Sequence, residues 1–121
     1  MSVSFGGIGE KAVTFEAASG VKAGYPVKMS ANGQVTACST GERMCGIALY
    51  VSDDGHATVQ MNGYVNMPYS GSGTPAVGYG HLLAGADGTV QVEAAGSEAF
   101  TGGEYLITDV DTTGKTVGFF M

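Results

Sequence analysis

Glycine is the residue that most constrains the fold of this chain. The 121 residues include 21 glycines and only three prolines, and the glycines are spread along the whole sequence. Glycine loses more backbone entropy on folding than any other residue, so this many glycines are tolerated mainly where tight turns use their freedom. Spread glycine is typical of many short turns, whereas clustered glycine indicates a linker. The sequence therefore predicts a chain that reverses direction often.

Turn dipeptides separate short segments with strand character. The turn signals are Asn32-Gly33, Asp54-Gly55, Asn62-Gly63, Asp87-Gly88 and Thr113-Gly114, and Asn-Gly and Asp-Gly favour hairpins because both residues tolerate positive φ. Between them, β-branched runs and period-two alternation predict strands at residues 11–17, 25–29, 34–38, 45–51, 57–61, 64–68, 80–84, 89–93, 104–109 and 115–120. We expect an all-β fold, a compact small barrel or sandwich of about ten short strands in hairpins. Little helix is expected, and its best candidate is residues 93–100.

The length of the chain suits one domain. Residues 1–10 differ from the rest because they combine Gly6, Gly7 and Gly9 with a single aromatic residue, Phe5. Such a segment has little to pack against alone. We therefore expect a flexible N-terminal arm over residues 1–10 and a single β domain over residues 11–121. The arm is either a frayed end or a segment that orders on a partner.

The charge of the chain limits its partners. Five basic residues oppose eleven acidic ones, which gives a formal net charge of −6. This balance argues against nucleic acid, whose binding depends on basic patches, and against anionic membranes. The first residues lack the pattern of a secretory signal, so we expect synthesis in a cytoplasm, with Cys38 and Cys45 as reduced thiols. A disulfide between these two cysteines across a hairpin loop stays open as an alternative.

The motifs that resemble catalytic or metal sites each lack an essential part. Cys38 and Cys45 are seven residues apart, unlike the closely spaced pairs of structural zinc sites. The segment 109–114 starts like a calcium loop, but Phe120 stands where that loop needs a bidentate glutamate. His56 is expected to be a solvated loop residue and His81 a half-buried strand residue. We therefore expect no enzyme activity, no metal and no cofactor.

The C-terminal end is unusually apolar. The sequence VGFFM at residues 117–121 ends a chain that contains six methionines, six tyrosines and five phenylalanines. A chain end this apolar is buried either as a core strand or at a subunit interface, because interface cores favour aromatic residues and Met. For the second alternative, the predicted interface residues are Phe119, Phe120 and Met121.

Four segments together resemble a known family. AVTF at 12–15, VKAGYPV at 21–27, CGIAL at 45–49 and VQMNGYV at 59–65 are similar to sequences of the small capsid decoration (cement) proteins of tailed bacteriophages. The similarity spans most of the chain. It implies a compact β-fold that binds the outer capsid surface as a homotrimer and stabilises the expanded head.

The resemblance also implies a partner and a contact segment. The partner would be the major capsid protein, and the location would be the virion surface after synthesis in the bacterial host cytoplasm. In such systems an N-terminal arm often pairs with the capsid protein. The matching residues here are Ser2, Val3, Ser4, Phe5, Gly6, Gly7 and Ile8.

Two alternatives belong to other functional classes. VKAGYPV at 21–27 also resembles hairpins of biotinyl and lipoyl carriers, although Lys22 and Lys28 lack the context of the modified lysine. A ligand-binding or glycan-binding β-module is the other alternative, and it would need exposed aromatic residues on one face.

Overall fold

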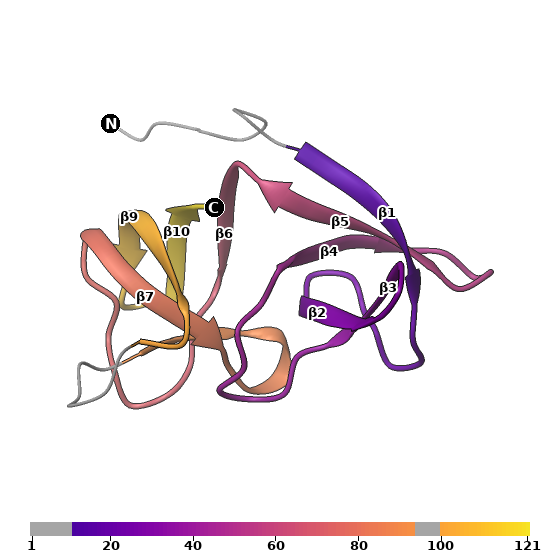
Figure 1. Cartoon of the computed structure of the whole chain (residues 1–121). Coiled ribbons are helices and arrows are strands. Elements are labelled where there is room, and N and C mark those ends of the chain that lie inside the picture. The colour runs from indigo at the N-terminus through magenta and orange to yellow at the C-terminus, as the bar shows by residue number, and fades with distance from the viewer. Residues whose placement is uncertain (1–10, 94–99) are drawn as a thin grey trace.

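The structure is a computed structural model that describes residues 11–93 and 100–121, and the described chain is all-β (Figure 1). The strands are β1 (Lys11–Ala17), β2 (Pro26–Ala31), β3 (Gln34–Ala37), β4 (Gly46–Val51), β5 (His56–Asn62), β6 (Tyr64–Pro68), β7 (Gly78–Ala84), β8 (Val90–Val92), β9 (Gly103–Asp111) and β10 (Thr116–Phe120). Each coincides with one predicted segment, and β1 and β6 have the predicted bounds. The predicted all-β fold is therefore confirmed.

The first half of the chain forms a closed barrel. Its strand order is β1-β3-β2-β4-β5, and β1 pairs with β5 to close it. Most neighbours are antiparallel, but β1 and β3 are parallel and pair only at Glu16↔Gln34 and Ala17↔Val35. Val27, Val35 and Val59 are fully buried inside the barrel, as expected of inward positions in strands of alternating pattern.

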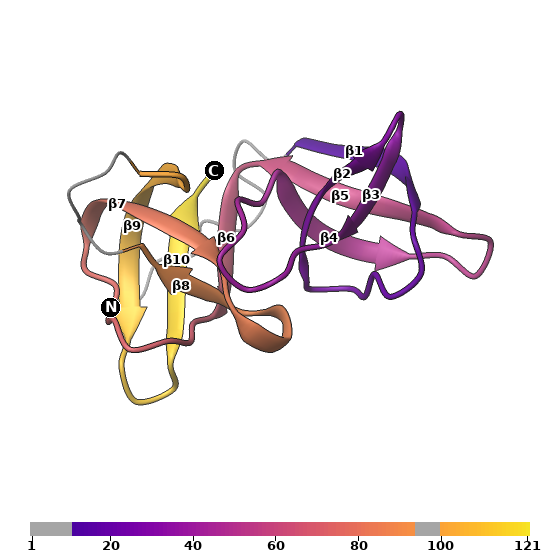
Figure 2. The same cartoon turned by 60° about the horizontal axis from the view of Figure 1, so that its bottom comes forward.

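The second half of the chain forms a separate five-stranded sheet. Its order is β6-β10-β9-β7-β8, and its named strand pairs are antiparallel. A bridge between Tyr69 and Val90 brings the two ends of this sheet together. Figures 1 and 2 show the barrel strands on one side of the molecule and β6–β10 on the other. The ten strands of the described chain thus form a five-stranded barrel and a second five-stranded sheet, in agreement with the predicted barrel or sandwich of about ten short strands.

The barrel and the second sheet share a hydrophobic core at their junction. Met44 and Ile47, from the first half of the chain, pack with Leu82, Val117 and Phe119 of the second sheet. The loop before β4 also joins β7 through the backbone, because the N–H of residue 41 donates to the carbonyl of residue 84 and the N–H of residue 84 donates to the carbonyl of residue 42. Apolar packing and paired backbone groups therefore hold the two halves together.

A buried glutamine spans the short connection between the halves. Gln60 is only 4% exposed, and its Nε2 donates to the carbonyls of Asn62 (3.1 Å) and Tyr64 (3.0 Å). These carbonyls lie on either side of Gly63, the single residue between β5 and β6. A buried amide is stabilising only when it is hydrogen-bonded, and both bonds here fix the path of the connection.

The turn chemistry agrees with the sequence at most of the predicted turns. Asp87 (φ 53°, ψ 44°) and Gly88 (φ 78°) both take positive φ, so the segment Ala86–Gly88 is a tight hairpin turn rather than a helical turn. At Thr113-Gly114 the positive φ falls instead on Lys115. Of the helical candidate 93–100, residues 94–99 lie outside the described residues, and Glu93 and Phe100 are not helical.

None of the described residues belongs to a helix with the length and hydropathy that a membrane span requires.

A pair of glycine variants tests the junction. A Cβ added at Gly88 would lie 2.5 Å from Cδ1 of Tyr25, whereas one added at Gly33 would meet no atom within 4 Å. Both glycines have positive φ, so Gly33→Ala should cost about 1 kcal/mol from backbone strain alone. Gly88→Ala should cost about 1–3 kcal/mol more, because the ring of Tyr25 must move. Urea denaturation measures both, and equal losses would contradict the packing of this turn on the barrel.

Candidate binding surfaces

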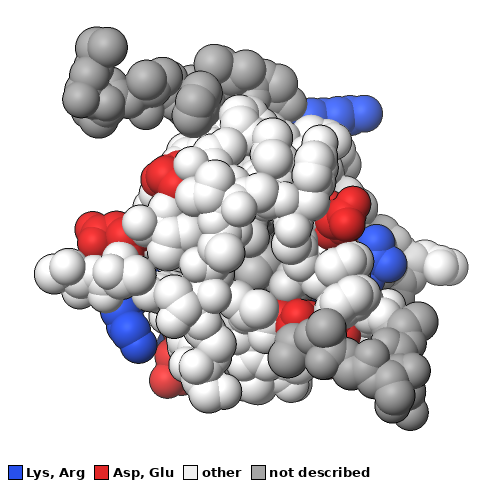
Figure 3. Space-filling view, turned by 90° about the vertical axis from the view of Figure 1, so that its left-hand side faces the viewer, with Lys and Arg blue, Asp and Glu red and all other residues white. Residues whose placement is uncertain are grey.

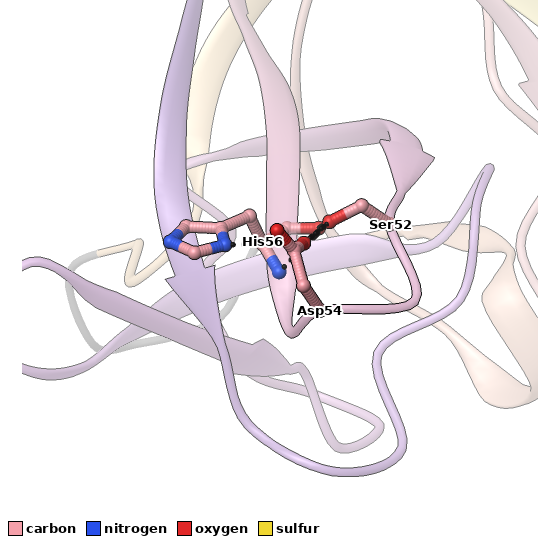
Figure 4. Close-up of polar contacts among 3 residues, drawn as sticks. All are labelled: Ser52, Asp54 and His56. Carbon is pink, nitrogen blue, oxygen red and sulfur yellow. Dashed lines mark hydrogen bonds and ion pairs between the residues drawn. The ribbon is translucent and has the colours of Figure 1, made fainter.

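The turn between β4 and β5 brings together a serine, an aspartate and a histidine (Figure 4). The Ser52 hydroxyl donates to the Asp54 carboxylate, and His56 Nδ1 lies 3.3 Å from Asp54 Oδ1. The backbone N–H of His56 also donates to Ser52 Oγ at 3.2 Å. The hydrogen bond from Ser52, followed by that from His56, lowers the pKa of Asp54.

The order of these contacts differs from that of a catalytic triad. In a triad the imidazole lies between the hydroxyl and the carboxylate, so that it can take the hydroxyl proton. Here Asp54 lies between Ser52 and His56, and the Ser52 hydroxyl donates a hydrogen bond to the carboxylate instead of to the imidazole. The three residues therefore stabilise a turn, and His56 is the exposed residue that the sequence predicted.

The two cysteines are free thiols in the structure. Burial is the main cause that raises the pKa of Cys38 from 9.0 to about 11, and the neighbouring Glu42 raises it further. Burial also raises the pKa of Cys45. Both thiols are therefore protonated near neutral pH, which disfavours nucleophilic chemistry. Within residues 11–93 and 100–121, no three His, Cys, Asp or Glu side chains cluster as metal ligands would.

Methionines line a hollow between the two halves of the molecule. This space of about 400 Å³ is lined by Lys28, Met29, Arg43, Met44, Cys45, Met61, Tyr105 and Met121. Met29 is 46% exposed, whereas Met44 belongs to the core. Methionine adapts to irregular gaps, and this composition suits the filling of a junction between two sheets.

The structure separates the predicted interface residues from one another. Phe119 is fully buried in the core, where its ring lies 5.2 Å from that of Tyr105. Phe120 and Met121 are partly exposed, and Met121 packs against the core. Of the three, Phe120 has its side chain on the outer face of the sheet, because successive strand residues alternate between faces. The predicted capsid contacts at residues 2–8 lie outside the described residues.

An apolar row crosses the outer face of the second sheet. Strand register pairs Tyr64 with Phe120, Phe120 with Leu106, and Leu106 with Tyr79. The four side chains therefore form a line across β6, β10, β9 and β7, which we call the outer row. Tyr79 is 76% exposed and Leu106 38%. The rings of Tyr64 and Phe120 meet edge to face, with centroids 5.4 Å apart.

Acidic residues beside the outer row have local partners. The Tyr64 hydroxyl donates to Asp109 Oδ1 at 2.8 Å, and the Thr108 hydroxyl donates to the same oxygen at 2.6 Å. The phenol reaches Asp109 across Gly118 of β10, where any Cβ would collide with both the hydroxyl and the carboxylate. Glu104 lies on the same face, 3.6 Å from His81 Nε2.

A hollow of about 480 Å³ adjoins the Tyr79 end of the outer row. His81 is partly buried, as the sequence predicted, and its ring stacks on Phe100 with centroids 3.8 Å apart and 4° between the planes. Glu93 accepts hydrogen bonds from the N–H and hydroxyl of Thr101 and from the N–H of Gly102, and these bonds lower the pKa of Glu93. The carboxylate thereby anchors the residues that follow Phe100. No lysine or arginine is among the lining residues described.

The outer edge of β1 is a second candidate binding surface. Antiparallel pairing with β5 covers one edge of β1 from Lys11 to Glu16. On the other edge, β3 reaches only Glu16 and Ala17, so residues 11–15 have no neighbouring strand there among the described residues. The side chains of residues 11–14 are exposed. β1 therefore presents an open strand edge, which is a template for pairing with another chain.

Comparison with known proteins gives no relative. No family model, curated protein or solved structure matches this chain.

The sequence identified only part of these surfaces. It singled out Phe120, but Tyr79 and Leu106 became its neighbours only through the register of β7, β9 and β10. The sequence contained one weak indication that Tyr79 is exposed. Tyr79 stands between Gly78 and Gly80, so this large side chain has no large residue directly beside it in the sequence. Alternation along residues 117–121 could also have placed Phe119 and Phe120 on opposite faces.

The raised thiol pKa predicts a loss of stability in alkali. A group whose pKa is higher in the folded state stabilises the fold below its unfolded pKa, and this contribution is lost as pH rises through the folded pKa. For Cys38 the window runs from 9.0 to about 11. Urea denaturation across this window should show a falling free energy of unfolding.

The Cys38→Ala variant is the control for this prediction. The free energy of unfolding of this variant should fall less steeply with pH than that of the parent. Part of the fall should remain, because burial also raises the pKa of Cys45 and of Tyr105. Identical declines in the variant and the parent would show that Cys38 does not contribute.

Proposed function

We propose that this chain is a structural protein that binds the major capsid protein on the outer surface of a phage capsid as a trimer and thereby stabilises the head. The family resemblance of the sequence supports this proposal. The structural observation that supports it is the outer edge of β1 at residues 11–15, which no strand covers among the described residues. An extended segment of the capsid protein can pair with such an edge through backbone hydrogen bonds.

The direction of the backbone groups on β1 defines which residues would pair. The N–H of Glu16 donates to the Gly33 carbonyl at 2.9 Å, on the side away from β5. Successive strand residues point their N–H groups to opposite edges, and the β1–β5 register is unbroken from Ala12 to Glu16. Thr14 and Ala12 therefore direct their backbone N–H and C=O groups outward.

Backbone pairing suits a protein that attaches through several weak contacts. Each hydrogen bond contributes only about 1 kcal/mol net, so a few of them give modest affinity. The copies of one trimer attach to the capsid simultaneously, so their combined attachment is much stronger than a single contact.

Removal of the N-terminal segment tests the proposal at its broadest. Deletion of residues 1–10 should abolish co-sedimentation with expanded heads assembled from the major capsid protein of the same genome. The circular dichroism spectrum should keep its β-sheet signature, because the ten strands of the described chain all lie within residues 11–120. Attachment that survives the deletion would exclude an essential role for this segment.

A proline variant tests the strand edge itself. Thr14→Pro removes the outward N–H without removing a bond to β5, and proline is tolerated on edge strands in this position. Attachment should weaken about tenfold or more, from the lost bond at each of several copies. Thr14→Ala keeps the N–H and is the matched control. Equal attachment by the two variants would contradict pairing at this edge.

A further inference from the structure

Four of the turn dipeptides have glycine directly after asparagine or aspartate, and such pairs carry a chemistry of their own. The backbone nitrogen of the glycine can attack Cγ of the preceding side chain and close a five-membered succinimide ring, because glycine has no Cβ to obstruct the approach. An asparagine amide reacts in this way with loss of ammonia, whereas an ionised carboxylate is a poor electrophile. The pairs are Asn32-Gly33, Asp54-Gly55, Asn62-Gly63 and Asp87-Gly88.

The fold restrains both aspartate pairs further. The N–H of Gly55, which would supply the attacking nitrogen, donates to the carbonyl of Ser52 at 3.2 Å. The Asp54 carboxylate is itself bonded to Ser52 and His56 (Figure 4). At the other pair, the ring of Tyr25 packs so closely on Gly88 that an added Cβ would lie 2.5 Å from it. The two asparagine pairs are therefore the reactive candidates.

The Asn62-Gly63 pair is fixed by the clamp at the connection between the two halves. Asn62 ends β5, is paired with Lys11, and its carbonyl accepts a hydrogen bond from Gln60 at 3.1 Å. Gly63 is buried, and its carbonyl accepts the N–H of Met121 at 3.0 Å. In an extended strand the next backbone nitrogen points away from Cγ, so ring closure requires rotation of the backbone. That rotation would break the bonds on this connection, and we expect Asn62 to be protected.

The Asn32-Gly33 pair lacks these restraints. The two residues form the whole turn between β2 and β3, and both are exposed. A Cβ added at Gly33 would meet no atom within 4 Å, so open space surrounds the residue. The Asn32 side chain has no hydrogen-bond partner among the described residues. Solvent base can reach the Gly33 nitrogen, and the amide of Asn32 is free to fold back onto it.

We infer that Asn32 is a modification site, which deamidates spontaneously in the folded protein while Asn62 does not. The Gly33 nitrogen gives its proton to base and forms a bond to Cγ of Asn32; the Cγ–Nδ2 bond breaks, and ammonia leaves. Water then opens the succinimide at one of its two carbonyls, which yields aspartate or isoaspartate. One amide and one water thus become one carboxylic acid and one ammonia, without any oxidant or reductant.

The isoaspartate product would act on the closure of the barrel. Its main chain runs through Cβ and Cγ, so it places one additional CH₂ group just before Gly33. The carbonyl of Gly33 accepts the N–H of Glu16 at 2.9 Å, beside the two residue pairs that join β1 to β3, Glu16↔Gln34 and Ala17↔Val35. A longer turn displaces this carbonyl, so the isoaspartate form should be less stable than the parent.

The new negative charge should have a smaller effect than the added length. It lowers the formal net charge of −6 by one unit, at an exposed turn where solvent and salt screen it. Acidic groups are accommodated singly elsewhere, and on the face in Figure 3 most Asp and Glu side chains lie apart from one another with uncharged surface between them.

The test follows both asparagines of the full chain by mass spectrometry during incubation at mildly alkaline pH. Cleavage after Lys28 and Arg43 releases peptide 29–43, in which Asn32 is the only asparagine. Deamidation adds about 1 Da. In the folded chain it should proceed at least about tenfold faster at Asn32 than at Asn62. In urea, which removes the clamp, the two rates should differ by less than about threefold. Equal rates in the folded chain, or a faster rate at Asn62, would overturn the inference.

Two variants test the chemistry and its structural effect. Gly33→Ala adds a Cβ beside the attacking nitrogen, where there is room for it, and should slow the reaction at Asn32 about tenfold or more without changing Asn62. An unchanged rate at Asn32 would contradict attack by this nitrogen. Asn32→Asp introduces the charge without the CH₂ group. The isoaspartate form, separated by chromatography, should unfold at a lower temperature than Asn32→Asp, and equal midpoints would contradict displacement of the β1–β3 contact.

Discussion

Closure of the barrel depends on β1, and this strand meets its two neighbours very unequally. It pairs with β5 along its length, but β3 reaches it at only two residues. The β3 strand pairs along its other edge with β2 in a hairpin that has a register shift between Met29 and Ala31. Two bridging residues close the barrel, and no other strand of residues 11–93 and 100–121 pairs with the rest of the outer edge of β1. The same geometry that completes the core therefore creates the surface on which the proposed attachment rests.

The two candidate surfaces differ in what they recognise. The edge of β1 offers backbone groups, which any extended chain can pair with, so its specificity depends little on side chains. The outer row offers four side chains whose positions are set by the register of four strands. One surface lies on the barrel and the other on the second sheet, so changes to either can be separated experimentally.

Local structure could be predicted from the sequence, whereas the surfaces largely could not. Alternation and turn dipeptides located all ten strands of the described chain, because both signals act between near neighbours. The division into two sheets depends on which strands pair, and pairs such as β6 with β10 join residues about fifty positions apart. Tyr79 and Leu106 become neighbours of Phe120 only through the pairing of β7, β9 and β10. Phe120 could be singled out from the sequence because the C-terminal segment 117–121 is unusually apolar.

The connection at Gly63 has a mechanical consequence. Gln60 bonds to the carbonyls on both sides of this residue, so β5 and β6 are held at a fixed angle. Tension applied to β1 passes to β5 through their antiparallel ladder and then reaches the second sheet through this clamped corner. A flexible linker would absorb such a load by extending. This chain would instead transmit the load from the barrel to the second sheet.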